Sequence, residues 1–167
     1  MHDELTQKDI DKMQAELDDR IRNLRPELIE EVKRTRAFGD LSENYEYKAA
    51  KQAKNRNESR IRYLTNMIKT ATIIEDRSDC DEVGLFDKVT LYIEEDEETM
   101  EVRVCTTVRT DPRLGFVSKE SPLGHAILGK KAGERATVRV NEQYSYDVII
   151  QTIEKSEDDG SAPLLSY

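Results

Sequence analysis

Two long stretches of helical periodicity, separated by a short break, constrain what this chain can fold into. In the first, from about Gln7 to Ala37, apolar residues recur at steps of three or four: Ile10, Met13, Leu17, Ile21, Leu24, Leu28 and Val32. In the second, from about Ser42 to Ile73, the steps give heptad spacing: Tyr47, Ala50, Lys54, Asn57, Ile61, Leu64 and Ile68. Such steps place side chains on one face of an α-helix. The sequence therefore predicts that residues 1–75 form an antiparallel coiled coil of two long helices, with its tip at residues 37–44.

The predicted rod is long and uneven. About thirty helical residues, each rising about 1.5 Å, give a length on the order of 45 Å. Pro26 interrupts the first helix, and because an internal proline removes a hydrogen bond and strains the preceding turn, at a cost of about 3 kcal/mol, we expect a kink near Arg25. In the second helix the seam near the tip holds the small or polar residues Ala50, Lys54 and Asn57. We expect the distal half of the coil to be the more mobile one.

Beyond Glu75 the apolar period changes to alternation. Apolar and polar residues alternate at 89–93 and again at 100–104, with an acidic turn between them, which predicts a β-hairpin. Further strands are expected at 116–117, 138–140 and 146–153, and a short helix at 122–128. Residues 76–155 thus predict a small antiparallel sheet with one helix packed on it, which makes the whole chain an α+β protein. Residues 156–167 are polar and acidic, and predict a mostly disordered tail.

Charge and cysteine content exclude several classes of partner and site. Fifteen acidic residues balance fifteen basic ones up to Glu75, whereas the remainder holds twenty acidic against eleven basic, so the net charge of −9 lies in the second half. That half is expected to repel bare nucleic acid. Cys80 and Cys105 have no second cysteine or histidine at metal-binding spacing, which is typical of a protein in the reducing cytoplasm. No apolar run approaches the roughly 20 residues that span a bilayer, so no membrane partner is expected.

The break between the helices carries two carboxylates, Asp40 and Glu43. An acid followed three residues later by Glu at a helix start is close to a capping box, in which both side chains bond to the backbone. The alternative is a solvent-facing pair at the end of a long arm, able to share a divalent cation. Magnesium prefers six oxygens, so two carboxylates would hold it only weakly without ligands from a partner. Docked against a site that already holds one Mg²⁺, the pair could complete a two-metal centre for phosphodiester hydrolysis.

Basic side chains predominate around this break. They are Lys33, Arg34, Arg36, Lys48, Lys51, Lys54, Arg56, Arg60 and Arg62, against the acids Asp40, Glu43, Glu46 and Glu58. Such a set can be a solvated helix face with ion pairs. It can also be a basic collar that holds a phosphate backbone behind the acids. The sequence leaves both interpretations open.

Several segments, in order along the chain, carry a family resemblance. They are Arg25-Pro26-Glu27-Leu28-Ile29, then Arg36 followed by Gly39-Asp40-Leu41-Ser42-Glu43-Asn44, Glu46-Tyr47-Lys48-Ala49-Ala50, Ser121-Pro122-Leu123-Gly124 and Leu128-Gly129-Lys130. Over roughly Leu5 to Glu154, this pattern resembles the Gre family of bacterial transcript-cleavage factors. The resemblance implies an N-terminal antiparallel coiled coil and a C-terminal FKBP-like domain. It also implies that the globular domain docks on the rim of the RNA polymerase secondary channel, while the coil passes down the channel to the active centre.

The resemblance further implies roles for individual residues. Asp40 and Glu43 match tip acids that stabilise a second Mg²⁺, held jointly with the polymerase, and help to position water for hydrolysis of the RNA 3′ end in a backtracked complex. The residues expected to contact RNA or the channel are Arg36, Lys51, Lys54 and Arg56, and those expected to dock on the polymerase are Glu120, Ser121, Pro122 and Leu123. Ser42 and Tyr45 depart from the family pattern, which often has a basic residue and a small residue at these positions.

Together these observations predict a cytoplasmic, monomeric transcription elongation factor that lends Asp40 and Glu43 to RNA polymerase and has no nuclease activity or stably bound cofactor of its own. A regulator that enters the same channel and blocks the active site without cleavage is an alternative, because inhibition needs occupancy rather than metal geometry. A prolyl isomerase is a third class, suggested by the FKBP-like domain. Its pocket normally needs an aromatic lining, for which 6% aromatic residues and no Trp are a poor supply.

Overall fold

The computed structural model describes residues 2–39 and 43–166, so that Asp40, Leu41 and Ser42 lie outside the described residues. The chain divides into two compact units. The first holds Ile10–Ala71 and the residues before Glu4, and the second holds Glu4–Asp9 and the chain from Thr72 onward. Across the described residues, no helix combines the length and the apolar content needed to cross a membrane.

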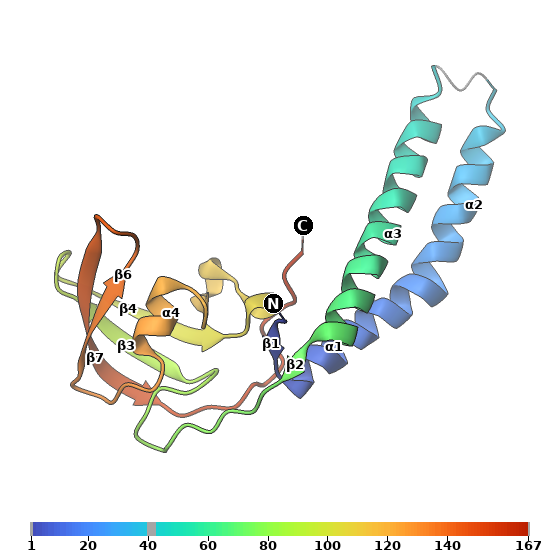
Figure 1. Cartoon of the computed structure of the whole chain (residues 1–167). Coiled ribbons are helices and arrows are strands. Elements are labelled where there is room, and N and C mark those ends of the chain that lie inside the picture. Colours follow the sequence, from blue (N-terminus) through green and yellow to red (C-terminus); the bar gives the residue numbers. More distant parts are fainter. Residues whose placement is uncertain (1, 40–42, 167) are drawn as a thin grey trace. The chain divides into compact units, whose positions relative to one another are not determined.

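The first unit is a helical hairpin. Its first arm consists of α1 (Gln7–Asp19) from Ile10 onward, a π-helical turn (Arg20–Leu24) and α2 (Arg25–Arg36), and its second arm is α3 (Tyr45–Thr70). Figure 1 shows α2 and α3 side by side, running in opposite directions. Most of the predicted α3 seam is buried, namely Tyr47, Ala50, Asn57, Ile61 and Leu64, and on α1 the apolar residues Met13 and Leu17 are buried. The helical periodicity read from the sequence is therefore confirmed.

Pro26 is accommodated by a π turn rather than by the end of the helix. It lies in the first turn of α2 and has no N–H to donate. Just before it, the N–H of Arg25 donates to the carbonyl of Arg20, five residues back, which is the π-helical pattern. The extra residue in this turn shifts side chains around the helix, and Ile21, expected in the apolar stripe, is 38% exposed. The irregularity expected near Arg25 takes the form of a widened turn.

A polar layer crosses the hairpin beside this turn. Glu16 accepts hydrogen bonds from Nε of Arg20 at 2.7 Å and from Nε of Arg60 at 2.9 Å, and Arg20 also donates to Oδ1 of Asn57 at 3.0 Å. Asn57 and Arg60 are both buried. Because these bonds form in only one alignment of the helices, the layer disfavours sliding of one arm along the other.

The second unit is built on a mixed sheet. Its five strands among the described residues are β3 (Lys88–Ile93), β4 (Glu98–Cys105), β5 (Phe116–Ser118), β6 (Arg135–Arg139) and β7 (Ser145–Glu154), in the spatial order β5-β4-β3-β7-β6. The predicted hairpin is confirmed as β3 and β4. The expectation of a purely antiparallel sheet is wrong, because β4 and β5 are parallel. Two 3₁₀ turns, Thr107–Arg109 and Pro112–Leu114, lie in the connection between β4 and β5, and this connection brings the chain back so that β5 runs in the same direction as β4.

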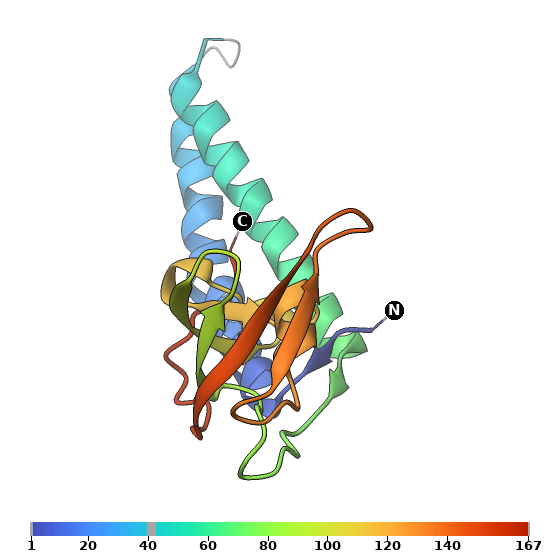
Figure 2. The same cartoon turned by 90° about the vertical axis from the view of Figure 1, so that its left-hand side faces the viewer.

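Helix α4 (Pro122–Ile127) packs against this sheet. Pro122 is in its first turn, and Gly129, with φ of +81°, follows its end, as the sequence predicted. Ile127 is fully buried and joins the apolar core formed by strand residues such as Leu91 and Ile150. Figure 2 looks onto the sheet, with β6 and β7 side by side in orange and red.

A short parallel pair that the sequence did not predict joins two distant segments of the second unit. It consists of β1 (Glu4–Leu5) and β2 (Thr72–Ile73). The N–H of Ile74 extends the pairing by donating to the carbonyl of Leu5 at 2.8 Å, and Leu5 is fully buried. Strands of two residues are too short to produce a recognisable alternation, which is why they escaped sequence analysis.

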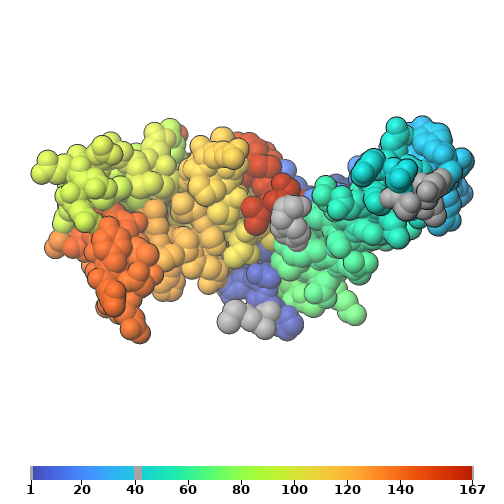
Figure 3. Space-filling model, turned by 90° about the horizontal axis from the view of Figure 1, so that it is seen from above, coloured from blue at the N-terminus to red at the C-terminus, as the bar shows by residue number. Residues whose placement is uncertain are grey.

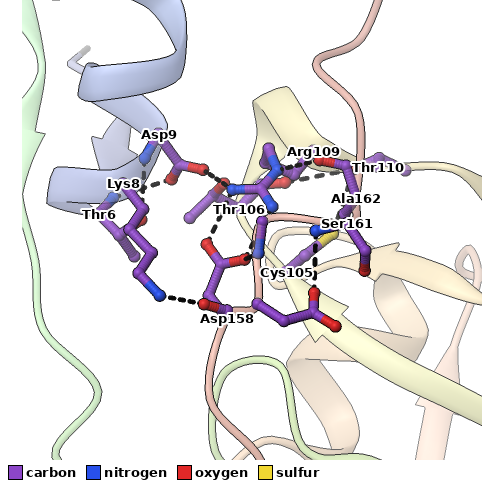
Figure 4. A network of polar contacts seen from close by, with 12 residues as sticks. Thr6, Lys8, Asp9, Cys105, Thr106, Arg109, Thr110, Asp158, Ser161 and Ala162 are labelled. Atoms are coloured by element: carbon purple, nitrogen blue, oxygen red, sulfur yellow. Dashed lines mark hydrogen bonds and ion pairs between the residues drawn. The ribbon is translucent and has the colours of Figure 1, made fainter.

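The acidic tail makes defined contacts instead of the disorder expected from its composition. Arg109 is fully buried; it donates to both carboxylate oxygens of Asp158 at 2.8 Å, to Asp9 at 3.0 Å and to the carbonyl of Ala162 at 2.6 Å (Figure 4). Ala162 is itself buried. In Figure 3 the red C-terminal segment lies against the yellow part of the same unit. A buried guanidinium needs acceptors, and the tail supplies most of them, which gives this segment a fixed course.

Candidate functional site

The predicted tip lies between α2 and α3. Glu43 is in the turn immediately before α3 and is exposed to solvent, whereas Asp40 lies outside the described residues. Gly39 has φ of +106°, in the region that glycine adopts readily and other residues rarely do. Glycine is therefore the residue suited to this point of the tip.

Asn44 joins the two arms next to Glu43. Its Oδ1 accepts the N–H of Tyr47 at 3.0 Å, which is the N-cap bond of α3, and its Nδ2 donates to the carbonyl of Thr35 at 2.7 Å, near the end of α2. Thr35 is fully buried, and its carbonyl also accepts the N–H of Phe38 at 3.1 Å. One amide side chain thus satisfies a donor of one helix and an acceptor of the other, and holds the backbone on both sides of the acidic segment.

The cap of α3 is therefore not the acidic pair. Helix α3 begins at Tyr45 and its N-cap is Asn44, so Glu43 precedes the helix and does not occupy the third helical position that the capping box requires; Asp40 lies outside the described residues. Glu43 contributes to the helix start only through its main chain in the contacts described, since its carbonyl accepts the N–H of Tyr45 at 3.1 Å. Its carboxylate belongs to an exposed residue and is accessible to a partner.

Three of the four predicted contact residues create a positive field around Tyr47. Arg36 donates to the Tyr47 hydroxyl at 3.3 Å, and its guanidinium carbon lies 5.7 Å from the ring centre. This hydrogen bond lowers the pKa of the hydroxyl most, burial opposes the shift, and the charges of Arg36, Lys51 and Lys54 lower the pKa further. Arg56, the fourth predicted residue, is exposed on α3.

Other basic side chains of the hairpin are engaged in surface ion pairs. Lys33 pairs with Glu30 at 3.2 Å, and Arg34 pairs with Glu31 at 2.5 Å, all with exposed side chains. For these residues the interpretation as a solvated helix face holds. The other interpretation, a collar that holds a phosphate backbone, stays a prediction for Arg36, Lys51, Lys54 and Arg56.

The predicted docking residues lie at the start of α4. Ser121 caps the helix, because its Oγ accepts the N–H of Gly124 at 3.1 Å while donating to the carbonyl of Ser118 at 2.6 Å. Glu120 and Pro122 are exposed, and Leu123 is half-buried. A hollow of about 370 Å³ beside them has a mostly apolar lining: Thr110, Pro112, Phe116, Val117, Ser118, Ser121, Pro122, Leu123, Val138, Val140 and Tyr146. The structure thus places three of the four predicted residues on a surface that can bury an apolar group, with Glu120 outside its lining.

Among the residues that the structure describes, Glu43 belongs to no group of three or more side chains able to share a cation, and its predicted partner Asp40 lies outside them. Among residues 2–39 and 43–166, the carboxylates close enough to share a cation are Asp79, Asp81 and Glu82, and Asp81 is already paired with Lys131 at 2.9 Å. A single exposed carboxylate can accept a hydrogen bond from water, or provide one ligand to a cation whose other ligands come from elsewhere. Glu43 is exposed, so its carboxylate is accessible to such a cation or water.

Sequence reasoning did not identify the residues that shape the tip. Asn44 carried a usable signal, because asparagine directly before a helical stretch is a preferred N-cap. Tyr47 was assigned only to the apolar seam, although its hydroxyl meets Arg36. Nothing in the sequence marked Thr35, whose role depends on a carbonyl and on the approach of a residue nine positions away.

Two family models match the chain. Residues 4–73 match the model described as "Transcription elongation factor, N-terminal", and residues 77–155 match "Transcription elongation factor, GreA/GreB, C-term". Transcription elongation factor GreA of Leuconostoc mesenteroides is 40% identical over 152 residues, which are 90% of this chain and 95% of the relative. GreA of Mesoplasma florum is 40% identical over 146 residues, 86% of this chain and 94% of the relative. Among solved structures, GreA factor homolog 1 (Gfh1) of Thermus thermophilus is similar with 23% identity and a TM-score of 0.43, covering 93% of this chain and 100% of its own.

Proposed function

Since the chain belongs to the GreA/GreB family of transcription elongation factors, we propose that it binds RNA polymerase and stimulates hydrolysis of backtracked RNA by the polymerase active site. Its own contribution is to carry acidic side chains into that site, and the free protein has no nuclease activity. It works as a monomer in the cytoplasm, where the polymerase is.

The two units have different tasks in this proposal. The helical hairpin is the coiled-coil arm that enters the secondary channel, and the second unit is an FKBP-like body that remains at the rim. The 26 residues of α3, at about 1.5 Å each, give an arm on the order of 40 Å long. The buried polar layer at Asn57 and Arg60 supports this role, because an arm that must place its tip accurately needs a fixed alignment of its helices.

Asp40 and Glu43 act as the catalytic carboxylates lent to the polymerase. The exposure of Glu43, and the anchoring of the backbone beside it by Asn44, support this assignment. The two carboxylates can fill only part of a magnesium coordination sphere, so the polymerase supplies the remaining ligands. When bound, the Mg²⁺ activates water and neutralises charge on the phosphate. The carboxylate oxygens accept a hydrogen bond from the attacking water and so orient its lone pair toward phosphorus.

The basic collar, formed by Arg36, Lys51, Lys54 and Arg56, positions the RNA. The positive field that lowers the Tyr47 pKa supports this role for the first three. Arginine and lysine attract the phosphate backbone without reading its sequence, so the collar holds RNA of any sequence near the acids.

The docking surface is the start of α4, with Glu120, Ser121, Pro122 and Leu123. The apolar hollow beside these residues supports the assignment, because an exposed apolar surface of this kind commonly takes a partner side chain. Glu120, at its edge, adds a charge that can pair with a basic residue of the polymerase.

The observation that carries the proposal is the exposed carboxylate of Glu43, next to a backbone anchored to both arms. Its test is RNA cleavage in a stalled, backtracked polymerase complex, with the double variant Asp40→Ala/Glu43→Ala compared with wild type. Glu30→Ala is the matched control, since it removes an exposed acid of the same hairpin that pairs only with Lys33 in the contacts described. We expect the double variant to bind polymerase and to lose cleavage, while the control retains it. Equal cleavage by all three proteins would show that the tip acids are not catalytic.

The same assay separates cleavage from the alternative of a non-cleaving channel regulator. Such a regulator would slow nucleotide addition and leave the RNA length unchanged. Its effect would also survive removal of both acids, because blocking requires only that the arm fills the channel.

A further inference from the structure

An exposed aromatic ring stands beside the catalytic segment. Tyr45, the first residue of α3, is 79% exposed, more than any other large hydrophobic side chain in the described residues. Its N–H donates to the carbonyl of Glu43 at 3.1 Å, so the backbone of the ring-bearing residue is linked directly to that of the acid. A group that meets the ring therefore lies close to Glu43.

The charged groups near the ring are of both signs, one ammonium group against two carboxylates, so they do not form a positive site for a phosphate. Lys48 places its ammonium nitrogen 5.5 Å from the ring centre. Glu43 and Glu46, two positions before and one position after Tyr45, are exposed and would repel a phosphate. A nucleobase has no such penalty, and stacking of bases on aromatic rings is a common way to hold single-stranded nucleic acid. The positive collar around Tyr47 is a separate place for the phosphates.

We propose that Tyr45 stacks on an unpaired base near the 3′ end of the backtracked RNA and thereby positions the adjacent phosphodiester for the tip acids. This inference rests on the proposed function. Stacking depends on the face of the base and not on its hydrogen-bonding edge, so Tyr45 favours the larger purines over pyrimidines without reading one sequence. A contact with the polymerase itself would show no dependence on the base.

The test uses the full chain, with Tyr45→Ala and the conservative variant Tyr45→Phe. Cleavage rates are measured in backtracked complexes whose extruded RNA ends in a natural purine or in an abasic nucleotide. On natural RNA we expect Tyr45→Ala to cleave about tenfold more slowly than wild type and Tyr45→Phe to stay within about twofold, because phenylalanine keeps the stacking face. On abasic RNA the difference between wild type and Tyr45→Ala is expected to disappear. Because Tyr45 is so exposed, neither variant disturbs packing.

Three results would overturn the inference. The first is an equal loss for Tyr45→Ala on natural and abasic RNA. The second is weaker binding of Tyr45→Ala to polymerase that carries no RNA, which would assign the ring to a protein contact. The third is equal cleavage by wild type and Tyr45→Ala, which refutes the inference and leaves the proposed function standing. Absence of cleavage by wild type would instead refute the proposed function, and this inference with it.

Discussion

Replacing Asn44 by alanine removes both side-chain bonds that connect the end of α2 to the start of α3. The cap bond to the N–H of Tyr47 contributes about 1 kcal/mol in comparable helices. The bond to the carbonyl of Thr35 contributes about 1 kcal/mol more as a neutral hydrogen bond. The tip should therefore open more easily by about 2 kcal/mol, although the buried seam below it is untouched.

Hydrogen exchange of the Lys48 amide measures this opening, because this N–H donates to the main-chain carbonyl of residue 44 at 3.2 Å, a bond that remains in every variant. In Asn44→Ala we expect this amide to exchange about thirtyfold faster than in wild type, the factor that corresponds to about 2 kcal/mol. Asn44→Asp is the matched variant, because it keeps the oxygen that accepts the Tyr47 N–H and replaces the donor to Thr35 with a carboxylate oxygen that cannot donate. It should exchange about fivefold faster than wild type.

The functional consequence follows from the position of Asn44 beside Glu43. Both variants should bind polymerase as wild type does, because the second unit is unchanged, and Asn44→Ala should cleave backtracked RNA more slowly than Asn44→Asp. Wild-type exchange rates of the Lys48 amide in both variants would refute the claim that the Asn44 side chain holds the tip. Wild-type cleavage by Asn44→Ala, despite fast exchange, would refute the link between anchoring and catalysis.

Three further predictions concern the body and the base of the arm. Asp158→Ala leaves the buried Arg109 with one carboxylate instead of two, and should lower the free energy of unfolding of the second unit by about 3 kcal/mol. Urea denaturation measures this change. Asp159→Ala, which removes an exposed neighbouring carboxylate, is the control and should change the free energy by less than about 1 kcal/mol. Burial raises the pKa of Glu16, but hydrogen bonds from Arg60 and Arg20 outweigh this effect, so the pKa in the folded protein lies below the ordinary value of 4.5. The stability that Glu16 contributes is therefore complete above pH 4.5 and is lost as the pH falls through the lower pKa of the folded protein. Thermal melts of Glu16→Gln should accordingly show a weaker loss of stability in acid than those of wild type. Burial raises the pKa of the Cys105 thiol to about 11, so a maleimide reagent at neutral pH should label the exposed Cys80 in the native protein and reach Cys105 only after unfolding, as mass spectrometry would show.

The helical hairpin could be predicted from the sequence because its information is local and repeated. The seam from Tyr47 to Leu64 repeats the spacing of three or four residues several times, and five of its residues are buried in the structure. The sequence predicted an irregularity at Pro26. Whether a helix accommodates proline by a kink or by a π turn depends on the residues that face it on the other arm of the hairpin. Here Arg20, at the start of the π turn, reaches Asn57 and Glu16, and nothing local to Pro26 encodes that arrangement.

The parts that escaped prediction depend on contacts between distant residues. Arg109 binds Asp9 and Asp158, which are 100 and 49 positions away, and composition alone made the tail appear disordered. The parallel pairing of β4 and β5 follows from two 3₁₀ turns, whereas the alternating pattern says only that strands exist. At the tip, the motif containing Asp40 and Glu43 was found readily, but the side chain that anchors it, Asn44, works through a carbonyl that no sequence pattern reveals.

The most direct test of the central claim is the length of the RNA in a stalled, backtracked polymerase complex when this protein is added with Mg²⁺. With RNA labelled at its 5′ end, we expect rapid shortening, release of a short 3′ fragment and resumed elongation from the new 3′ hydroxyl. The protein without polymerase should leave the same RNA intact. RNA of unchanged length in the complex, accompanied by slower nucleotide addition, would contradict the account and identify the protein as a regulator that enters the channel without cleavage.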